Sequence, residues 1–151
     1  MATLKPDVRR ATVTDLDLLV PLFDAYRRFY RLPSELEQAR RFLLEHFQNN
    51  DSVIFLAFDD SVLIGFTQLY PSFSSGAMAR IFVLNDLFVV PEARRRGAAS
   101  ALLQAAAQYA RTAGAVRLAL STEIANTTAQ SLYERMAWKR DTVFYVYQLA
   151  L

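Results

Sequence analysis

The stretch DLFVVPEARRRGAASALL, from Asp86 to Leu103, decides the fold of this chain. It begins as an apolar strand, breaks at Pro91, crosses an arginine-rich turn to Gly97 and continues as an alanine-rich helix. The first N–H groups of a helix lack intrahelical partners and lie at the positive end of its dipole, so a phosphate can bind them. Glycine lets a ligand approach the backbone closely. The stretch therefore predicts a site for an anionic, phosphate-bearing ligand.

The composition is that of a packed globular protein. Of the 151 residues, 53% are hydrophobic and 13% aromatic, which is enough to bury one core and too much for a disordered chain. Charges interrupt every apolar run well before the ~20 residues that a membrane span needs, and they break up the start of the chain. We therefore expect a single domain, residues 1–151, in the cytoplasm and with no membrane partner.

Cysteine and histidine usage excludes several kinds of site. The chain has no cysteine, which rules out disulfides, thiolate nucleophiles and cysteine-type zinc sites. It has a single histidine, His46, so no metal site is expected, and we interpret His46 as an ordinary residue near a helix end. The charge is balanced, with 17 basic and 15 acidic residues, which does not indicate a nucleic-acid partner.

Capping and apolar spacing predict the elements before residue 50. A strand is expected at 8–12, followed by a helix that begins at Thr14 with Asp17 three residues on. Ser34 with Glu37 repeats this capping pattern for a second helix, 35–47. Its inward side is predicted to carry Leu36, Phe42, Leu43 and Phe47.

The rest of the chain alternates between strands and helices. Three strands with short connections are expected to form an antiparallel meander, at 53–58, 62–70 and 79–90. The helix from Gly97 to Thr112 ends at Gly114 and separates the third of these strands from a strand at 116–121, which should pair in parallel through a crossover. A short helix, 126–135, and a last strand, 142–151, complete the chain. The last strand is apolar on both faces, which favours burial in the sheet or across a homodimer boundary.

A second pattern is Asn126-x-x-Ala129-Gln130-x-Leu132-Tyr133-Glu134. Asn126 and Tyr133 are seven residues apart, about two helical turns, so both project from one helix face. An amide and a phenol on that face suit a ligand with a polar chain and a reactive end. The alternative interpretations are that Asn126 is a helix N-cap and that Tyr133 is a core aromatic residue.

The first pattern, Leu87-x-Val89-x-Pro91-x-x-Arg94-x-x-Gly97-x-Ala99, resembles the coenzyme A pyrophosphate loop of the GNAT superfamily of N-acetyltransferases, and the second resembles that family's next helix. The resemblance implies a mixed α/β (α+β) fold, in which about four helices flank a mainly antiparallel central sheet with a parallel pair at the cofactor site. Within the superfamily, the branch of yeast-type histone and D-amino-acid N-acetyltransferases is the most similar, on the residues 85–89 and 129–133.

The resemblance also implies a reaction, the transfer of an acetyl group from acetyl-CoA to a primary amine of a small molecule, amino acid or peptide by direct attack. Tyr133 would donate a proton to the departing thiolate. An ammonium with a pKa near ~10 must first lose a proton, for which Asp86, Glu123 or a water are the candidates, with Asp86 favoured. The implied cofactor contacts are Leu87, Phe88, Val89, Val90, Arg94, Arg95, Arg96, Gly97, Ala98, Ala99, Ser100, Asn126, Ala129 and Tyr133.

Two features depart from the family pattern. The loop has only one glycine, Gly97, and Ala137 precedes Trp138 where the family commonly has a glycine. At Ala137, a residue with a Cβ therefore occupies a position where the chain often needs the left-handed conformation that ends a helix.

The alternative function for the whole chain is a non-catalytic acyl-CoA-binding sensor or a protein-interaction module.

Overall fold

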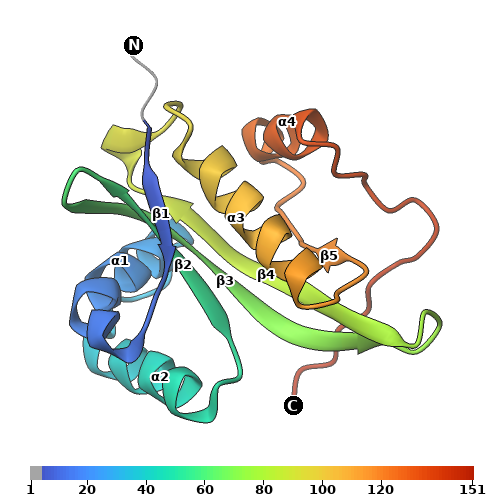
Figure 1. Cartoon of the computed structure of the whole chain (residues 1–151), viewed down its shortest axis with the longest axis horizontal. Coiled ribbons are helices and arrows are strands. Elements are labelled where there is room, and N and C mark those ends of the chain that lie inside the picture. Colours follow the sequence, from blue (N-terminus) through green and yellow to red (C-terminus); the bar gives the residue numbers. More distant parts are fainter. Residues whose placement is uncertain (1–4) are drawn as a thin grey trace. The chain divides into compact units, whose positions relative to one another are not determined.

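Five strands form one sheet in the order β1-β2-β3-β4-β5 in the computed structural model, which describes residues 5–151 (Figure 1). Neighbouring strands are antiparallel, except that β4 and β5 are parallel and pair Phe82 with Leu118 and Val83 with Ala119. The predicted meander and the parallel pair after the long helix are confirmed. The strands are Asp7–Arg10 (β1), Val53–Asp59 (β2), Val62–Ser74 (β3), Ala79–Val89 (β4) and Leu118–Ala119 (β5).

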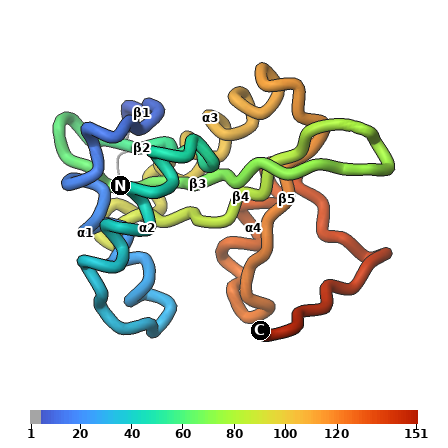
Figure 2. Tube along the Cα trace, turned by 90° about the horizontal axis from the view of Figure 1, so that it is seen from below, coloured from blue at the N-terminus to red at the C-terminus, as the bar shows by residue number. Residues whose placement is uncertain are grey.

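The chain divides into two compact units, of which the first ends at Leu120 and the second comprises Ser121–Leu151. In the first unit, α1 and α2 cover one face of the sheet and α3 covers the other (Figures 1 and 2). The second unit contains α4. The expectation that residues 1–151 form a single domain stays a prediction. Among residues 5–151, no helix is both long and apolar enough to span a membrane. The helices are Leu16–Phe29 (α1), Leu36–Asn49 (α2), Ala98–Thr112 (α3) and Thr127–Arg135 (α4).

Apolar side chains on both faces of the sheet form the core of the first unit. Successive side chains of a strand point to opposite faces. Leu56 of β2 is thus buried in the cluster with α1 and α2, whereas the ring of Phe55 packs against that of Tyr109 in α3, with centroids 5.8 Å apart. Gly65 of β3 allows the strands to approach, because a Cβ there would lie 2.8 Å from the carbonyl oxygen of Phe88.

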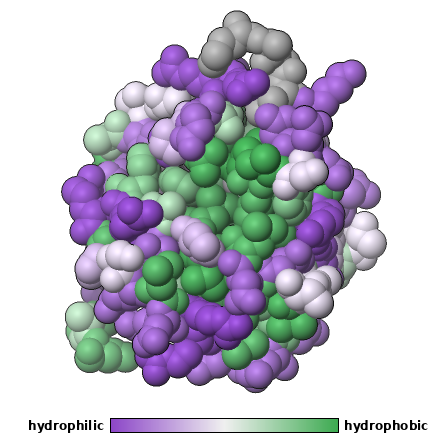
Figure 3. All heavy atoms as spheres, turned by 90° about the vertical axis from the view of Figure 1, so that its left-hand side faces the viewer, coloured by the Kyte–Doolittle hydropathy of each residue, from purple (hydrophilic) through white to green (hydrophobic). Residues whose placement is uncertain are grey.

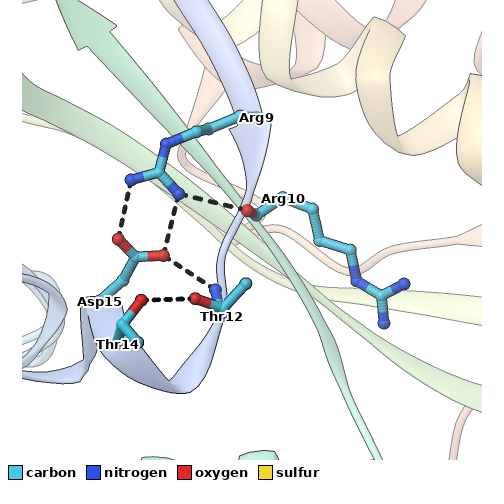
Figure 4. Close-up of polar contacts among 5 residues, drawn as sticks. All are labelled: Arg9, Arg10, Thr12, Thr14 and Asp15. Carbon is cyan, nitrogen blue, oxygen red and sulfur yellow. Dashed lines mark hydrogen bonds and ion pairs between the residues drawn. The ribbon is translucent and has the colours of Figure 1, made fainter.

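A buried carboxylate caps the turn before α1, two residues earlier than predicted. Asp15 accepts a hydrogen bond from the backbone N–H of Thr12 at 2.8 Å, and Arg9 donates two more at 2.9 and 2.7 Å (Figure 4). The hydrogen bond from Arg9 is the main cause that holds the pKa of Asp15 below its usual value. The predicted cap of Thr14 with Asp17 is wrong, since the Thr14 hydroxyl contacts that of Thr12 instead, at 2.7 Å.

The start of α2 is held by a side chain of α1. Asp24 accepts hydrogen bonds from the Ser34 hydroxyl at 2.8 Å and from the backbone N–H of Glu35 at 2.9 Å. Burial raises the pKa of Asp24, but these hydrogen bonds and the nearby arginines outweigh that effect and lower it. The predicted capping box of Ser34 with Glu37 is wrong, because Glu35 is the cap position and the Ser34 hydroxyl donates to the other helix.

The outer sides of α1 and α2 carry apolar as well as polar side chains. Figure 3 views the side of the molecule on which these helices lie and shows apolar side chains gathered among polar ones. Leu43 is fully buried and Phe47 partly buried, as predicted, but Leu36 and Phe42 are exposed. The inward stripe of α2 is narrower than expected, because only Ala39 and Leu43 of this helix are fully covered.

The hairpin between β3 and β4 is longer than the sequence indicates. The strand predicted at 62–70 extends further, because β3 continues to Ser74 and pairs Pro71 with Phe82. Proline lacks a donor N–H and is tolerated where one side of a strand has no neighbour. The pairing of β2 begins at Val53, opposite Leu69, so Pro71 lies beyond it.

Glycine ends α3 as predicted, in a left-handed conformation. Gly114 has φ 79° and donates to the carbonyl of Arg111 at 3.0 Å, while Ala115 donates to that of Ala110 at 2.9 Å. These two bonds are those of a Schellman motif and satisfy the last carbonyls of the helix. The expected strand at 116–121 is reduced to the two residues of β5, Leu118–Ala119.

In the second unit, alanine takes the place of glycine at the end of α4. Ala137 has φ 68°, and Trp138 donates to the carbonyl of Tyr133 at 2.9 Å, so the left-handed turn forms despite the Cβ. The predicted last strand, 142–151, is wrong. This segment has no strand pairing and its large apolar side chains are exposed: Val143, Phe144, Tyr145, Val146, Tyr147, Leu149 and Leu151.

Candidate functional site

The turn between β4 and α3 contains two left-handed residues directly before the start of a helix. Arg95 and Gly97 are both left-handed, with φ 61° and 96°, on either side of Arg96. Anion-binding nests are built from successive right- and left-handed residues, and Arg95 and Gly97 supply the left-handed kind of position. Gly97 is the N-cap of α3 and has no side chain to cap it, and the first turn carries no acidic residue. The N–H groups of Ala98, Ala99 and Ser100 thus keep the positive end of the helix open to an anion.

The three arginines of this turn have different surroundings. Arg94 donates through Nε to the carbonyl of Val89 at 2.8 Å, and its guanidinium carbon lies 4.8 Å from the ring centroid of Phe29 and 5.5 Å from that of Phe88. Arg94 therefore braces the turn against α1 and β4. Arg95 is exposed.

Arg96 is the arginine of the turn that lacks a partner for a buried donor. Its Nε is buried and has no hydrogen-bond partner in the part of the chain that the structure describes. A buried donor without a partner is costly, and a phosphate oxygen is the acceptor that a guanidinium binds best. The residues of the turn therefore fit a pyrophosphate group.

A β-bulge in β4 places Asp86 in the interior. Gln68 pairs with Asp86 and Leu69 with Leu84, so that Asn85 is the extra residue between them. Asp86 is 4% exposed, and its carboxylate accepts hydrogen bonds from the side-chain amides of Gln68 at 2.8 Å and Asn85 at 3.1 Å. A buried carboxylate with these neutral donors stays available to a cationic ligand.

Two tyrosines lie close enough to Asp86 to feel its charge. Burial raises the pKa of Tyr26, and the charge of Asp86 and a side-chain hydrogen bond with it raise it further. Burial and the same charge also raise the pKa of Tyr70. Both phenols therefore remain protonated at neutral pH and surround the carboxylate with uncharged polar groups.

The bulge also determines the direction of the backbone groups that follow it. The N–H of Val90 donates to the carbonyl of Ile64 at 2.9 Å and thus faces β3. Backbone groups alternate along a strand, so those of Leu87 and Val89 point to the opposite edge of β4. There the pairing with β5 covers only Phe82 and Val83. Beyond that pairing, this edge of β4 has no neighbouring strand among the described residues, and the carbonyl of Val89 accepts from Arg94 instead.

In the second unit, α4 has the cap that the alternative interpretation of Asn126 predicts. The side-chain oxygen of Asn126 accepts a hydrogen bond from the backbone N–H of Ala129 at 3.2 Å. Tyr133 is half-buried, and its ring centroid is 6.0 Å from that of Trp138. Asn126, Ala129 and Tyr133 share one face by their spacing. Their cofactor contacts, and the role of Glu123, stay predictions.

Sequence reasoning missed Gln68 and Tyr70. Gln68 was detectable as the one amide within the apolar run Val62–Tyr70, because an amide inside a buried strand needs a polar partner.

His46 lies late in α2, as expected, and its Nδ1 pairs with Asp51 at the helix end. Among the described residues, no group of three or more acidic or histidine side chains is arranged to hold a metal ion.

Comparisons with known proteins agree with this geometry. Residues 19–138 match the model of the Acetyltransferase (GNAT) family. A Bacillus subtilis (strain 168) protein described as the uncharacterized N-acetyltransferase YhfO is 49% identical over 143 residues, which are 95% of this chain and 96% of that protein. The crystal structure of a probable acetyltransferase, 45% identical, has a TM-score of 0.91 and covers 96% of this chain and 97% of its own.

A more distant solved structure shows the same fold with a ligand. The aminoglycoside N-acetyltransferase AAC(6')-Iy in complex with CoA is 21% identical, with a TM-score of 0.81 over 97% of this chain and 95% of its own. At this identity the likeness concerns the fold alone. It confirms the mixed α/β architecture expected from the sequence.

Proposed function

Because the chain belongs to the GNAT family of acetyltransferases, we propose that it moves the acetyl group of acetyl-CoA to a primary amine of a small molecule, amino acid or peptide by direct attack. The observation that carries this proposal is the β4–α3 turn. Two left-handed residues and the open start of α3 form an anion site, and Arg96 contributes a buried donor without a partner among the described residues.

The cofactor supplies an activated thioester, and the chain supplies the groups that hold it. The N–H groups of Ala98, Ala99 and Ser100, together with Arg96, would bind the pyrophosphate. The backbone groups of Leu87 would hold the pantetheine arm, and the N–H of Val89, whose carbonyl already accepts from Arg94, would hold the carbonyl oxygen of the acetyl group in the manner of an oxyanion hole. Phe88 and Val90 would flank them on β4.

Asp86 is the group that we assign to the amine. An alkylammonium with a pKa near ~10 is attracted by a buried carboxylate and must lose one proton before its nitrogen attacks. Asp86 would accept that proton, directly or through a water, while Gln68 and Tyr26 orient the carboxylate. Glu123 is the alternative base.

Tyr133 is proposed as the acid that donates a proton to the departing thiolate. A phenol with an ordinary pKa near ~10 still carries its proton at neutral pH, so it can donate that proton as negative charge develops on the sulfur. The spacing of Tyr133 from Asn126 on α4 supports the assignment. Asn126 would then cap α4 through its side-chain oxygen and contact the pantetheine arm of the cofactor through its amide nitrogen.

The expected branch of the family, the homodimer and the cytoplasmic location are part of the same proposal. The pattern at 85–89 and 129–133 supports membership of the yeast-type histone and D-amino-acid N-acetyltransferase branch. The exposed apolar side chains of residues 143–151 support a homodimer that covers them. The absence of a long apolar helix in the described residues is compatible with the cytoplasmic location expected from composition.

Acetyl transfer is tested with a panel of amino acids, polyamines and short peptides. Release of coenzyme A is followed with a thiol reagent, and acetylated product by mass spectrometry. We expect turnover with at least one amine, and Tyr133→Phe should reduce kcat by about 10²-fold or more while acetyl-CoA binding by calorimetry is unchanged. Binding of acetyl-CoA without transfer to any amine would favour the alternative, a non-catalytic acyl-CoA sensor or interaction module.

A further inference from the structure

A cavity lies at the other end of α3 from the β4–α3 turn. Its volume is about 400 Å³, within the range of small-molecule sites. It is lined by residues of β1, β2, β3, β4 and α3, all within the first unit. Ala113, which follows the last turn of α3, is part of the lining, whereas the proposed pyrophosphate site precedes Ala98. A helix of this length separates the two sites by roughly 20 Å.

Two arginines line this cavity, and both are held by aromatic rings. The guanidinium carbon of Arg10 lies 5.1 Å from the ring centroid of Tyr109, and that of Arg80 lies 4.5 Å from Phe73 and 5.9 Å from Phe82. Figure 4 shows that Arg10 leaves β1 on the opposite side from Arg9, which binds Asp15. Stacking limits the rotation of a guanidinium and leaves the N–H groups on its edge free to donate.

Neither arginine has an anionic partner in the part of the chain that the structure describes. The ion pairs of residues 5–151 do not include Arg10 or Arg80, and no Asp or Glu lines the cavity. Two positive charges that share one cavity repel each other unless an anion lies between them. The cavity therefore lacks a counter-charge, and a ligand is the means of supplying it.

The end of α3 supplies at most a partial negative charge and no carboxylate. A helix C-terminus normally presents carbonyl oxygens and the negative end of its dipole. Here the carbonyls of Ala110 and Arg111 already accept hydrogen bonds from Ala115 and Gly114. The Schellman motif thus occupies two of the last carbonyls of the helix, which would otherwise be acceptors for the arginines.

The remaining lining residues indicate the shape of the ligand. Asn50 and Ser52 offer an amide and a hydroxyl, while Val53, Pro71 and Phe82 form an apolar wall. Guanidinium groups bind the paired oxygens of carboxylates and phosphates with two parallel hydrogen bonds. A compound with an oxyanion at one end and a flat apolar body at the other satisfies both parts of the lining.

We propose that this cavity, which we call the Arg10–Arg80 pocket, binds a small organic oxyanion, a carboxylate or a phosphate monoester with a flat apolar body, and that this site is separate from that of acetyl-CoA. The proposal goes beyond acetyl transfer and does not depend on it. It makes the pocket a place where a metabolite binds to the protein without taking part in the reaction.

Isothermal titration calorimetry on the full chain tests the proposal without any acetyl donor. The probes are phenyl phosphate and benzoate, with the uncharged benzyl alcohol and inorganic phosphate for comparison. We expect phenyl phosphate or benzoate to bind with a Kd of about 1 mM or tighter, and benzyl alcohol not to bind. Which of the two anions binds more tightly identifies the oxyanion as phosphate or carboxylate.

Variants assign the binding to the pocket. Arg10→Gln and Arg80→Gln should each weaken binding about 10-fold or more, since each removes a charge-assisted pair of hydrogen bonds. Arg111→Gln is the matched control, because Arg111 is an exposed arginine of α3 that does not line the pocket, and it should bind as the unaltered protein does. Arg80→Lys keeps the charge but loses the planar fork, so an intermediate loss is expected and shows the role of geometry. Circular dichroism verifies that each variant is folded.

Three results would overturn the proposal. One is the absence of binding by both organic anions at millimolar concentration. Another is unchanged affinity in Arg10→Gln and Arg80→Gln. The third is displacement of the bound anion by coenzyme A, which would place it at the β4–α3 turn. A saturating amount of coenzyme A should instead leave the affinity for the anion unchanged, and that result supports two separate sites.

Discussion

Gln68 of β3 donates its side-chain amide to the carboxylate of Asp86 of β4 at 2.8 Å, and both residues are buried. The contact joins two neighbouring strands next to a β-bulge, on the face of the sheet covered by α1 and α2. Tyr26 of α1 lies close enough to the same carboxylate for its charge to raise the pKa of the phenol. A carboxylate held in this way has a defined orientation toward whatever cation reaches it.

The first prediction concerns this carboxylate. Asp86→Asn keeps the shape of the side chain but cannot accept a proton, so kcat/KM for the amine should fall about 10²- to 10⁴-fold, with little change in acetyl-CoA affinity. Steady-state kinetics and calorimetry measure the two quantities. Asp17→Asn is the matched control, because Asp17 is exposed and pairs only with Arg40. Turnover that survives Asp86→Asn would move the base to Glu123 or to water.

The second prediction separates two arginines of the β4–α3 turn. Arg96→Ala should weaken acetyl-CoA binding about 10-fold or more, because a charge-assisted hydrogen bond to phosphate is lost, and should make binding less sensitive to salt. Arg94→Ala should mainly lower the free energy of unfolding, since it removes the contacts with Phe29, Phe88 and Val89. Calorimetry at two salt concentrations and denaturant unfolding are the measurements. The reverse pattern would show that Arg94 is the phosphate ligand.

The third prediction compares two left-handed glycines at opposite ends of α3. Gly97→Ala and Gly114→Ala both place a Cβ at positive φ, so each should lower the free energy of unfolding by about 1–2 kcal/mol. A Cβ at Gly114 would meet no atom within 4 Å, so its cost is backbone strain alone. Only Gly97→Ala should also weaken acetyl-CoA binding. Equal affinity in the two variants would argue against close approach of the cofactor at Gly97.

The fourth prediction is a pH dependence of stability that comes from Asp15. The hydrogen bond with Arg9 lowers the pKa of Asp15 in the folded protein, so its stabilisation is complete above the ordinary aspartate value near ~3.9. It is lost as the pH falls through the lower pKa of the folded state. Asp15→Asn should therefore lower the free energy of unfolding by about 1 kcal/mol at pH 7, as for the loss of a cap, and the difference should shrink at acidic pH.

Urea unfolding of Asp15→Asn and the unaltered protein between pH 7 and pH 2 measures this difference. The exposed Asp17 again provides the control, since Asp17→Asn should have a small effect that hardly varies with pH. A difference for Asp15 that stayed constant down to pH 2 would contradict a charge-based role. It would point instead to lost packing at the start of α1.

Local sequence signals predicted the elements well and their ends less well. The meander, the parallel pair, α3 with its terminal Gly114 and the cap at Asn126 all follow from patterns within a few residues. The cap before α1, Thr12 with Asp15, is also local but lies two residues earlier than predicted. The cap of α2 is not local, because Asp24, which holds its start, lies ten residues before Ser34 and in another helix. The last strand was expected from apolar composition alone, which does not specify a partner for pairing.

The sequence by itself determined that an arginine-rich turn joins a strand to a helix at Gly97, because glycine, the arginines and the helix start are local features. It also determined the family, since both of its patterns are linear. The tertiary structure alone decided which arginine braces the turn and which keeps a buried donor without a partner among the described residues. It likewise decided that Asp86 meets Gln68 and Tyr26, because a one-residue bulge changes which side chains of β4 face α1.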